Sequence, residues 1–264
     1  MQYDPIKNIF NRLIEGSDQL RILFFSLLDV FFLRQRYVKR SIRKYFDRSD
    51  SFRFYDAGAG FCQYSWHILK KYPHSRVFAV DLKKDYLRSF AGFIRPRMPE
   101  RFHFQEADLQ VFEPKLHYDL AVAIDILEHI PDDVSAMKNI YNCLNPNGKL
   151  IISTPSDTDE AARFTEEHVR PGYDMHELRT KLESVGFTIR ESHFSYGVWG
   201  ARAWRLMIKH PLALLGRSKF FFPILPLYYL FVLPLGLIMM QMDLQRENST
   251  GTGIIVVAEK PETL

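Results

Sequence analysis

The stretch Phe52-Arg-Phe-Tyr-Asp-Ala-Gly-Ala-Gly-Phe-Cys-Gln-Tyr-Ser65 decides the fold. It begins with apolar residues typical of a buried strand, reaches an acid at Asp56, and passes through Gly58 and Gly60 into an expected helix. Glycine at these positions lets the backbone turn tightly and approach a ligand, and the free N–H groups at the helix start face that ligand. The stretch therefore predicts a nucleotide-binding loop. Gln63 stands where the dinucleotide fingerprint needs its last glycine, which argues against a dehydrogenase.

Three further expected strands, two of them apolar and one alternating, end at an acidic residue, as the first one does. They are Val77–Val80 before Asp81, Phe102–Ala107 before Asp108, and Tyr118–Ile124 before Asp125. Helical patterns separate them, so we expect parallel strands joined by crossover helices. Ligands of such sheets bind outside the carboxyl ends of the strands, and a carboxylate after the second strand can accept both hydroxyls of a ribose. The acids are therefore expected around one nucleotide site.

These motifs resemble those of the class I S-adenosylmethionine-dependent methyltransferases, particularly the small-molecule group that includes the quinone-biosynthesis enzymes. The resemblance covers residues 50 to 195 and the last strand, and departs from the family pattern at Cys62, where many members have a third glycine. It implies an α/β fold with a doubly wound, mixed seven-stranded Rossmann-like sheet, and S-adenosylmethionine as cofactor. The matching motifs are Asp56–Gly60, Asp81, Ala107–Leu109, Asp125–Pro131 and Leu144–Ser153.

The resemblance also assigns cofactor-binding roles. Asp81 is expected on the ribose with Leu82 beside it, Asp108 and Leu109 at the adenine, and Asp125 at the amino group of the methionine moiety. A single aspartate is as often a helix cap or a turn residue, so the assignment depends on the whole pattern. In similar enzymes the segment before the first strand closes over the cofactor, which places Arg36 and Tyr37 at its carboxylate. The full expected set is Asp56, Ala57, Gly58, Ala59, Gly60, Asp81, Leu82, Asp108, Leu109, Asp125 and Ile126.

Two histidines are candidates for the catalytic base. A histidine titrates near neutrality and can take the proton of an acceptor hydroxyl. His168 is the first choice, in a polar loop after the fifth strand, and its alternative role is to anchor that loop. His129 is the second choice, and its alternative is to shape the loop around the cofactor. Arg170 and Tyr173 are expected to orient the substrate, and no cluster of side chains argues for a metal.

The composition allows one α/β domain with additions. The chain has 264 residues, a net charge of +4, and two cysteines, Cys62 and Cys143, in unrelated segments. These features predict a reduced, cytoplasmic protein without a disulfide. The first residues have no charged-then-apolar layout, so no cleaved signal peptide is expected.

Residues 1–48 are expected to be helical. The apolar run Arg21–Leu33 is interrupted by Asp29 and followed by a basic stretch from Arg34 to Arg48. One interpretation is a pair of helices that cover the sheet and expose a basic face. The other is a helix on an anionic membrane, because apolar and basic faces together favour binding at a lipid interface.

Residues 198–250 separate the sixth and seventh strands, which form a hairpin in similar enzymes. Within this insertion, Phe220–Met242 carries no charge and is long enough to cross a bilayer. A single crossing would place the last strand, Gly253–Lys260, on the side opposite its sheet. We therefore expect a broken helical hairpin, bent at Pro211 and interrupted at prolines 223, 226 and 234, that dips into one leaflet. A lid packed on residues 20–33 and a homodimer interface remain alternatives.

The resulting hypothesis divides the chain into an N-terminal helical segment (1–48), a methyltransferase domain (49–197 plus 251–264) and the insertion (198–250). It predicts metal-free, in-line methyl transfer to oxygen of an apolar, lipid-linked or quinone-like small molecule, with peripheral contact to the cytoplasmic membrane face through 198–250 and 21–48. One alternative is a soluble small-molecule enzyme whose insertion is a lid or dimer arm. Another is a non-catalytic protein of the same fold. Nucleic acid is not expected as a partner, because the basic residues accompany apolar stretches.

Overall fold

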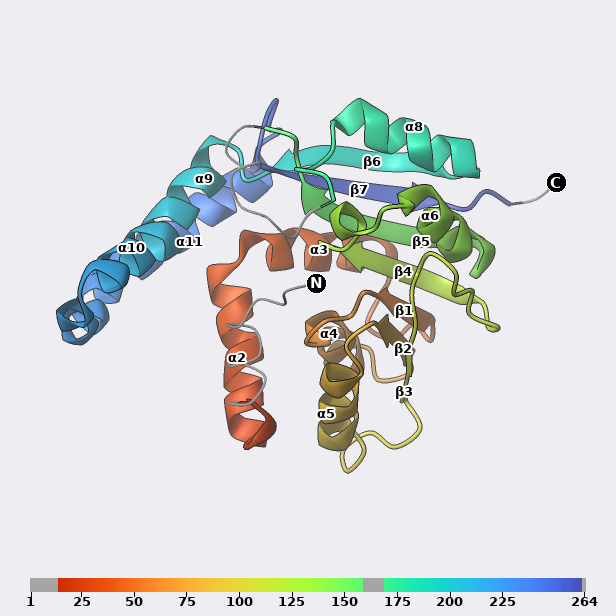
Figure 1. The fold of residues 1–264 in the computed structure, drawn as a ribbon, viewed down its shortest axis with the longest axis horizontal. Helices are drawn as coiled ribbons and strands as arrows, with labels where there is room; N and C mark the ends of the chain where they lie inside the picture. Colours follow the sequence, from red (N-terminus) through yellow and green to blue (C-terminus); the bar gives the residue numbers. More distant parts are fainter. Residues whose placement is uncertain (1–13, 159–168, 263–264) are drawn as a thin grey trace.

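The computed structural model describes residues 14–158 and 169–262 and contains one seven-stranded sheet with strand order β3-β2-β1-β4-β5-β7-β6 (Figure 1). β1 to β5 are parallel, whereas β7 is antiparallel to both β5 and β6. The predicted mixed, doubly wound sheet is therefore confirmed. The strands are β1 (Arg53–Ala57), β2 (Arg76–Asp81), β3 (Phe102–Glu106), β4 (Tyr118–Ile124), β5 (Leu144–Pro155), β6 (Thr188–Ser195) and β7 (Gly253–Glu259).

Helices cover both faces of the sheet, because successive side chains of a strand point to opposite sides. In β1, Phe54 packs into a core with α3, α4 and α5, and Tyr55 packs into a second core with α6 and α8. The helices of the domain are α2 (Asp18–Phe31), α3 (Leu33–Tyr45), α4 (Gln63–Lys71), α5 (Lys84–Ile94), the 3₁₀ turn η1 (Leu127–His129), α6 (Asp133–Asn142) and α8 (Met175–Val185).

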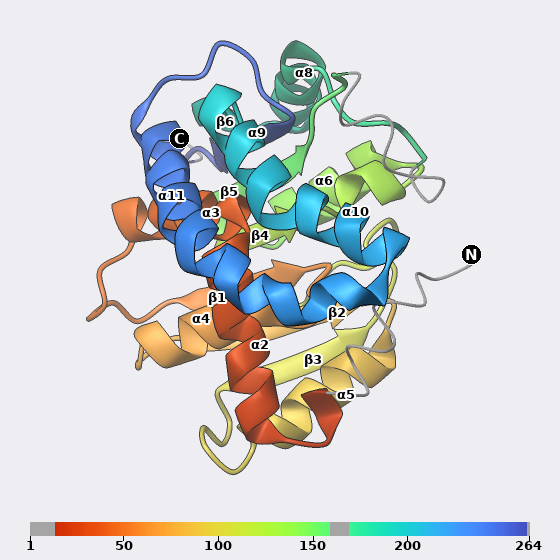
Figure 2. The same cartoon turned by 90° about the vertical axis from the view of Figure 1, so that its left-hand side faces the viewer.

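The insertion before β7 is a helical hairpin that projects from one end of the sheet (Figures 1 and 2). Its outgoing arm runs through α9 (Val198–Trp204), a π-helical turn (Arg205–Lys209) and α10 (His210–Arg217). A 3₁₀ turn (Lys219–Ile224) forms the tip, and α11 (Leu225–Gln245) returns to the sheet. Both ends of the hairpin join strands of the same sheet, β6 before it and β7 after it, so the chain returns to the sheet and does not cross to another side. The predicted apolar helical insertion is confirmed.

The prolines act differently from one another. Pro211 does not end its helix, because the chain passes through a π-helical turn just before it. Proline has no N–H to donate to the Met207 carbonyl four residues earlier. That carbonyl accepts a hydrogen bond from the Tyr229 hydroxyl at 2.7 Å instead. Pro223 and Pro226 lie at the tip and in the first turn of α11, as the expected break requires. Pro234 lies inside a continuous α11, so the expected break there is wrong.

The two arms of the hairpin pack closely where Gly236 faces Met207. A Cβ atom at position 236 would overlap the Met207 sulfur, so only glycine allows this approach. At the base, Asp243 of α11 is fully buried and accepts hydrogen bonds from the Tyr37 hydroxyl at 2.9 Å and from the Gly200 N–H at 2.9 Å. The base of the hairpin is thus fixed to α3 by buried hydrogen bonds.

The outer surface of the hairpin is apolar and uncovered. Among the described residues, Phe220–Gln245 is the one helical stretch long and apolar enough to cross a membrane, and only 6% of its most apolar window is buried within the protein. A core helix of a soluble domain would be mostly buried. The exposed apolar side chains are Leu212, Phe220, Phe222, Ile224, Leu227, Leu230, Phe231, Leu235 and Ile238.

Candidate functional site

The glycine-rich loop has the backbone geometry that its sequence predicts. Gly58 and Gly60 adopt φ angles of 79° and 50°, a region that glycine enters without strain. A Cβ at position 58 would come within 2.5 Å of Ile126, whereas a Cβ at position 60 would meet no atom within 4 Å and would point into open space. Cys62, at the family's third glycine, keeps the left-handed conformation at φ 60°. The cysteine therefore preserves the loop at a cost of about 1 kcal/mol in backbone strain.

Asp56 supports the loop from below. It is 2% exposed and accepts hydrogen bonds from the Ser65 N–H at 3.0 Å and from the Ser65 hydroxyl at 2.6 Å. Burial raises the pKa of its carboxyl to about 7, although the bonds from Ser65 favour the charged form. Asp56 was expected among the cofactor-binding residues, and in the structure its carboxylate fixes the start of α4 through Ser65.

Asp81 lies at the carboxyl end of β2 and faces the loop. Its Oδ2 accepts from the Gly60 N–H at 2.8 Å, and its Oδ1 accepts from the Lys83 N–H at 2.8 Å. A carboxylate offers about four lone-pair sites, so two remain for ligand hydroxyls. The next residue, Leu82, is 51% exposed and can cover the side of a bound ribose. This arrangement suits the expected ribose site.

Asp108 and Leu109 differ in what they offer to an adenine. The Asp108 carboxylate accepts from the Gln110 N–H at 2.9 Å and from the Gln110 side-chain amide, a turn arrangement. Leu109 is 5% exposed and packs in the core beside β4. Its side chain is therefore part of the core rather than of a cofactor-facing surface. The predicted adenine contacts are left to the Asp108 carboxylate and the local backbone.

The N-terminal segment reaches the site through Arg34, not through the residues expected from the sequence. Arg34, in the first turn of α3, forms an ion pair with Asp125, which follows β4 at φ 49°. Tyr37 instead bonds with Asp243 of the hairpin, and Arg36 lines a separate cavity. The expectation for Arg36 and Tyr37 is wrong because the extended residue Phe32 between α2 and α3 sets the helix register. No sequence pattern marks that break.

Glu128 is a buried acid, which the sequence alone placed only in the loop after the fourth strand, beside His129. It is fully buried, accepts from the Thr154 hydroxyl at 3.1 Å, and has its Oε1 without a partner among the described residues. Burial raises the pKa of this carboxyl. Its carbonyl accepts from the Val169 N–H at 3.0 Å, and the half-buried His129 follows it in the 3₁₀ turn. The Glu-His pair therefore joins the loop after β4 to the loop after β5.

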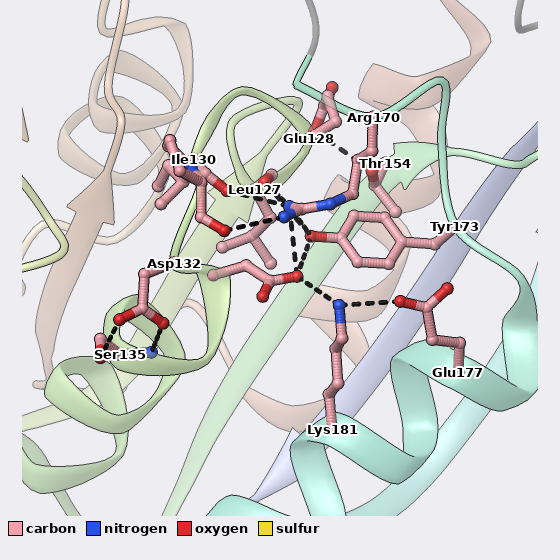
Figure 3. A network of polar contacts seen from close by, with 12 residues as sticks. Leu127, Glu128, Ile130, Asp132, Ser135, Thr154, Arg170, Tyr173, Glu177 and Lys181 are labelled. Carbon is pink, nitrogen blue, oxygen red and sulfur yellow. Dashed lines mark hydrogen bonds and ion pairs between the residues drawn. The ribbon is translucent and has the colours of Figure 1, made fainter.

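Arg170 and Tyr173 lie in a network of polar contacts that supports this region from beneath (Figure 3). Tyr173 has no exposed surface, and its hydroxyl donates to Asp133 at 2.6 Å, which also receives the Lys181 ammonium at 2.8 Å. The expected substrate contact of Tyr173 is therefore corrected to a supporting role. Arg170 has the same role, because its guanidinium donates to the backbone carbonyls of Leu127, Ile130 and Pro131.

The first choice for the base, His168, lies outside the described residues, so its role stays a prediction. Within the part of the chain that the structure describes, no group of three or more metal-ligating side chains occurs. The described site thus consists of the loop from Gly58 to Gly60, the acid Asp81, and the Arg34–Asp125 pair.

Comparison with known proteins agrees with this geometry. Residues 55–150 match a methyltransferase domain family. A trans-aconitate 2-methyltransferase of Rhodopseudomonas palustris is 27% identical over 115 residues, and a malonyl-[acyl-carrier protein] O-methyltransferase of Ilyobacter polytropus is 24% identical over 159 residues. The matches cover 44% and 60% of this chain; the chain spans 43% and 61% of those relatives' own lengths.

Solved structures share the fold. A Haemonchus contortus phosphoethanolamine N-methyltransferase with bound S-adenosyl-L-methionine superposes with a TM-score of 0.61 at 15% identity, over 96% of this chain and 60% of that one. The [4+2]-cyclase SpnF has the same TM-score at 17% identity, over 86% of this chain and 81% of that one. Residues 55–150 are thus a methyltransferase domain, and the chain as a whole has the seven-stranded fold of the S-adenosylmethionine-dependent methyltransferases.

Proposed function

We propose that the protein transfers the methyl group of S-adenosylmethionine to an oxygen of an apolar, lipid-linked or quinone-like acceptor at a membrane surface. One observation carries the proposal: α3 joins the cofactor site to the apolar hairpin. At its first turn Arg34 pairs with Asp125, and one turn later Tyr37 bonds with Asp243 of α11. An acceptor held at the hairpin is therefore presented next to the methyl donor's reactive end.

The chemistry asks little of the side chains. The methyl group leaves a positively charged sulfonium in an in-line displacement, so the protein aligns donor and acceptor and removes one proton. Asp81 and the loop hold the nucleoside, and Arg34 with Asp125 faces the amino and carboxylate groups of the methionine moiety. His168 or His129 takes the hydroxyl proton. The O-methyltransferase name of the Ilyobacter polytropus relative supports transfer to oxygen.

The shape of the hairpin supports the proposed peripheral attachment to the cytoplasmic membrane face. Both ends return to the sheet, so the apolar tip can enter one leaflet while the domain stays in water. Leu20, Leu23 and Leu27 form a second exposed apolar face on α2. Burying exposed leucine and phenylalanine side chains stabilises binding by about 1.5–3 kcal/mol each.

The second candidate is a homodimer arm in a soluble small-molecule enzyme, which the same exposed apolar surface favours, since a patch of this kind is usually covered. The two candidates separate in one experiment on Leu230→Asn/Phe231→Asn, two exposed sites on α11. Val111→Asn/Leu116→Asn, also exposed but remote from the hairpin, is the matched control.

Co-sedimentation with phosphatidylcholine/phosphatidylglycerol vesicles and light scattering after gel filtration are measured together. The proposal expects at least a hundredfold weaker vesicle binding for the hairpin variant and no change for the control. A different result would support the dimer arm and exclude the membrane from the function. In that case the wild-type protein is a dimer that does not bind vesicles, and the hairpin variant is a monomer.

A further inference from the structure

A basic cavity lies at the base of the hairpin, apart from the cofactor site. It encloses about 370 Å³ between α3, the end of α2 and the carboxyl end of α11. From α3 it receives Gln35, Arg36, Lys39, Arg40 and Arg43, from α2 it receives Asp29, and from α11 it receives Gln241, Leu244 and Gln245. The basic positions follow a helical repeat of three and four residues, so one face of α3 supplies them all.

The charge in this cavity is unbalanced. Arg36, Lys39, Arg40 and Arg43 give four positive charges against the single carboxylate of Asp29, which pairs with Lys39. Arg40 donates to the Leu244 carbonyl at the end of α11. Within the described residues, neither Arg36 nor Arg43 forms an ion pair with a carboxylate, although Asp29 is close enough to Arg36 to act on it electrostatically. The lining therefore carries a net charge of +3, from four cations minus one anion.

Two buried polar atoms of the lining also lack partners. The Nε–H of Arg36 is buried with no acceptor among the described residues, and the side-chain oxygen of Gln35, a residue that is 5% exposed, is buried without a donor. Leaving a buried polar group unpaired costs about 1–3 kcal/mol. Burial lowers the pKa of Lys39 and nearby Arg43 acts in the same direction, so an anion in the cavity would offset the repulsion from Arg43. The unpaired Arg36 donor and the excess positive charge suit an oxygen acceptor with negative charge, whereas the Gln35 oxygen is itself an acceptor and needs a donor.

The position of the cavity fits a lipid headgroup. From Leu225 to Ile238, α11 rises about 20 Å at 1.5 Å per residue, while one leaflet of hydrocarbon is about 15 Å thick. A tilted hairpin therefore buries its apolar length in one leaflet and leaves Gln241 to Gln245 at the headgroup layer. Arg217 near the tip limits how deep this end can lie, because a guanidinium at the bilayer centre is costly.

We propose that this cavity binds the phosphate of an anionic phospholipid, with Arg36 and Arg43 as its main ligands. The inference rests on the membrane docking in the proposed function and not on methyl transfer. The bound lipid would fix the depth of the hairpin and, through α3, the position of Arg34 at the cofactor site. The phosphate would also supply the acceptor that the Arg36 Nε–H lacks.

The test compares the wild-type protein with Arg36→Gln/Arg43→Gln and with Arg53→Gln/Arg76→Gln. The control pair removes the same charge from exposed positions at the amino ends of β1 and β2. Binding to pure phosphatidylcholine vesicles and to vesicles with added phosphatidylglycerol is measured by co-sedimentation. Circular dichroism and calorimetric titration with S-adenosylmethionine check that each variant folds and still binds its cofactor.

The proposal expects the cavity variant to lose about tenfold or more of its affinity for the anionic vesicles, with pure phosphatidylcholine binding unchanged and the control within threefold of wild type. An equal loss in both variants would mean general surface attraction and overturn the site. Full competition by millimolar inorganic phosphate or glycerol phosphate would make the ligand a soluble phosphate and overturn the lipid assignment. Cofactor binding is read separately by calorimetry, so its failure does not mimic these outcomes.

Discussion

The substitution Asp81→Asn tests the cofactor site in its most defined part. Each Asp81 oxygen already accepts one backbone N–H at 2.8 Å, from Gly60 and from Lys83, and the remaining lone pairs face the expected ribose. Asparagine replaces one carboxylate oxygen with an NH₂ group. Because an NH₂ group cannot accept a hydrogen bond, one of the two backbone N–H donors loses its acceptor. The change removes a charged acceptor from one ligand hydroxyl, worth about 1.5–3 kcal/mol, and loosens the loop. We expect S-adenosylmethionine to bind about 10- to 150-fold more weakly.

The assay is calorimetric titration of S-adenosylmethionine into each purified variant. Asp85→Asn is the matched control, since it makes the same chemical change at an exposed position four residues later. The control should bind like the wild-type protein. If Asp81→Asn binds within threefold of wild type and has an unchanged melting temperature, the ribose assignment is refuted.

Three more predictions concern the hairpin anchor, the buried acid and the base. Asp243→Ala removes the acceptor of Tyr37 and the Gly200 N–H, so urea unfolding should show a loss of about 3 kcal/mol or more, and a loss below 1 kcal/mol would contradict the anchor. Burial holds the pKa of Asp56 near 7, above its unfolded value, so the folded protein keeps a proton on Asp56 at low pH and loses this stabilisation as the pH rises through 7. Relative to Asp56→Asn, the free energy of unfolding of the wild-type protein should fall by up to about 1.4 kcal/mol per pH unit between pH 5 and 7. Equal pH dependence of the two unfolding free energies would exclude this pKa. His168→Gln should lower kcat with little change in cofactor affinity, and full turnover at saturating acceptor would remove the base assignment.

The sheet and the loop could be predicted because their signals are local. The strand ending at Asp56, the two glycines after it, and the acid at the end of each later strand are read within a few residues. The chain also had to return its last strand to the sheet, which predicted a hairpin rather than a crossing. The register of α3 could not be predicted, because it depends on the extended residue Phe32, and so Arg34 was missed.

Side-chain direction was the second thing that sequence could not supply. Arg170 and Tyr173 lie near the site as expected, yet they point beneath it, toward Asp133. Pro234 illustrates a related point, because this exposed proline lies within a continuous α11. The basic cavity is assembled from α3 and α11, which lie far apart in the sequence, so only the fold brings Arg36 beside Gln241.

The measurement that tests the central claim most directly is methyl transfer from S-adenosylmethionine with a radiolabelled methyl group, using purified protein and bacterial membrane extract. The reaction is partitioned between organic solvent and water, and the label in each phase is counted, with trans-aconitate supplied in a parallel reaction. The account predicts protein-dependent label in the organic phase, reduced by Asp81→Asn and by Leu230→Asn/Phe231→Asn. Label confined to water-soluble products such as methylated aconitate would contradict an apolar acceptor at the membrane.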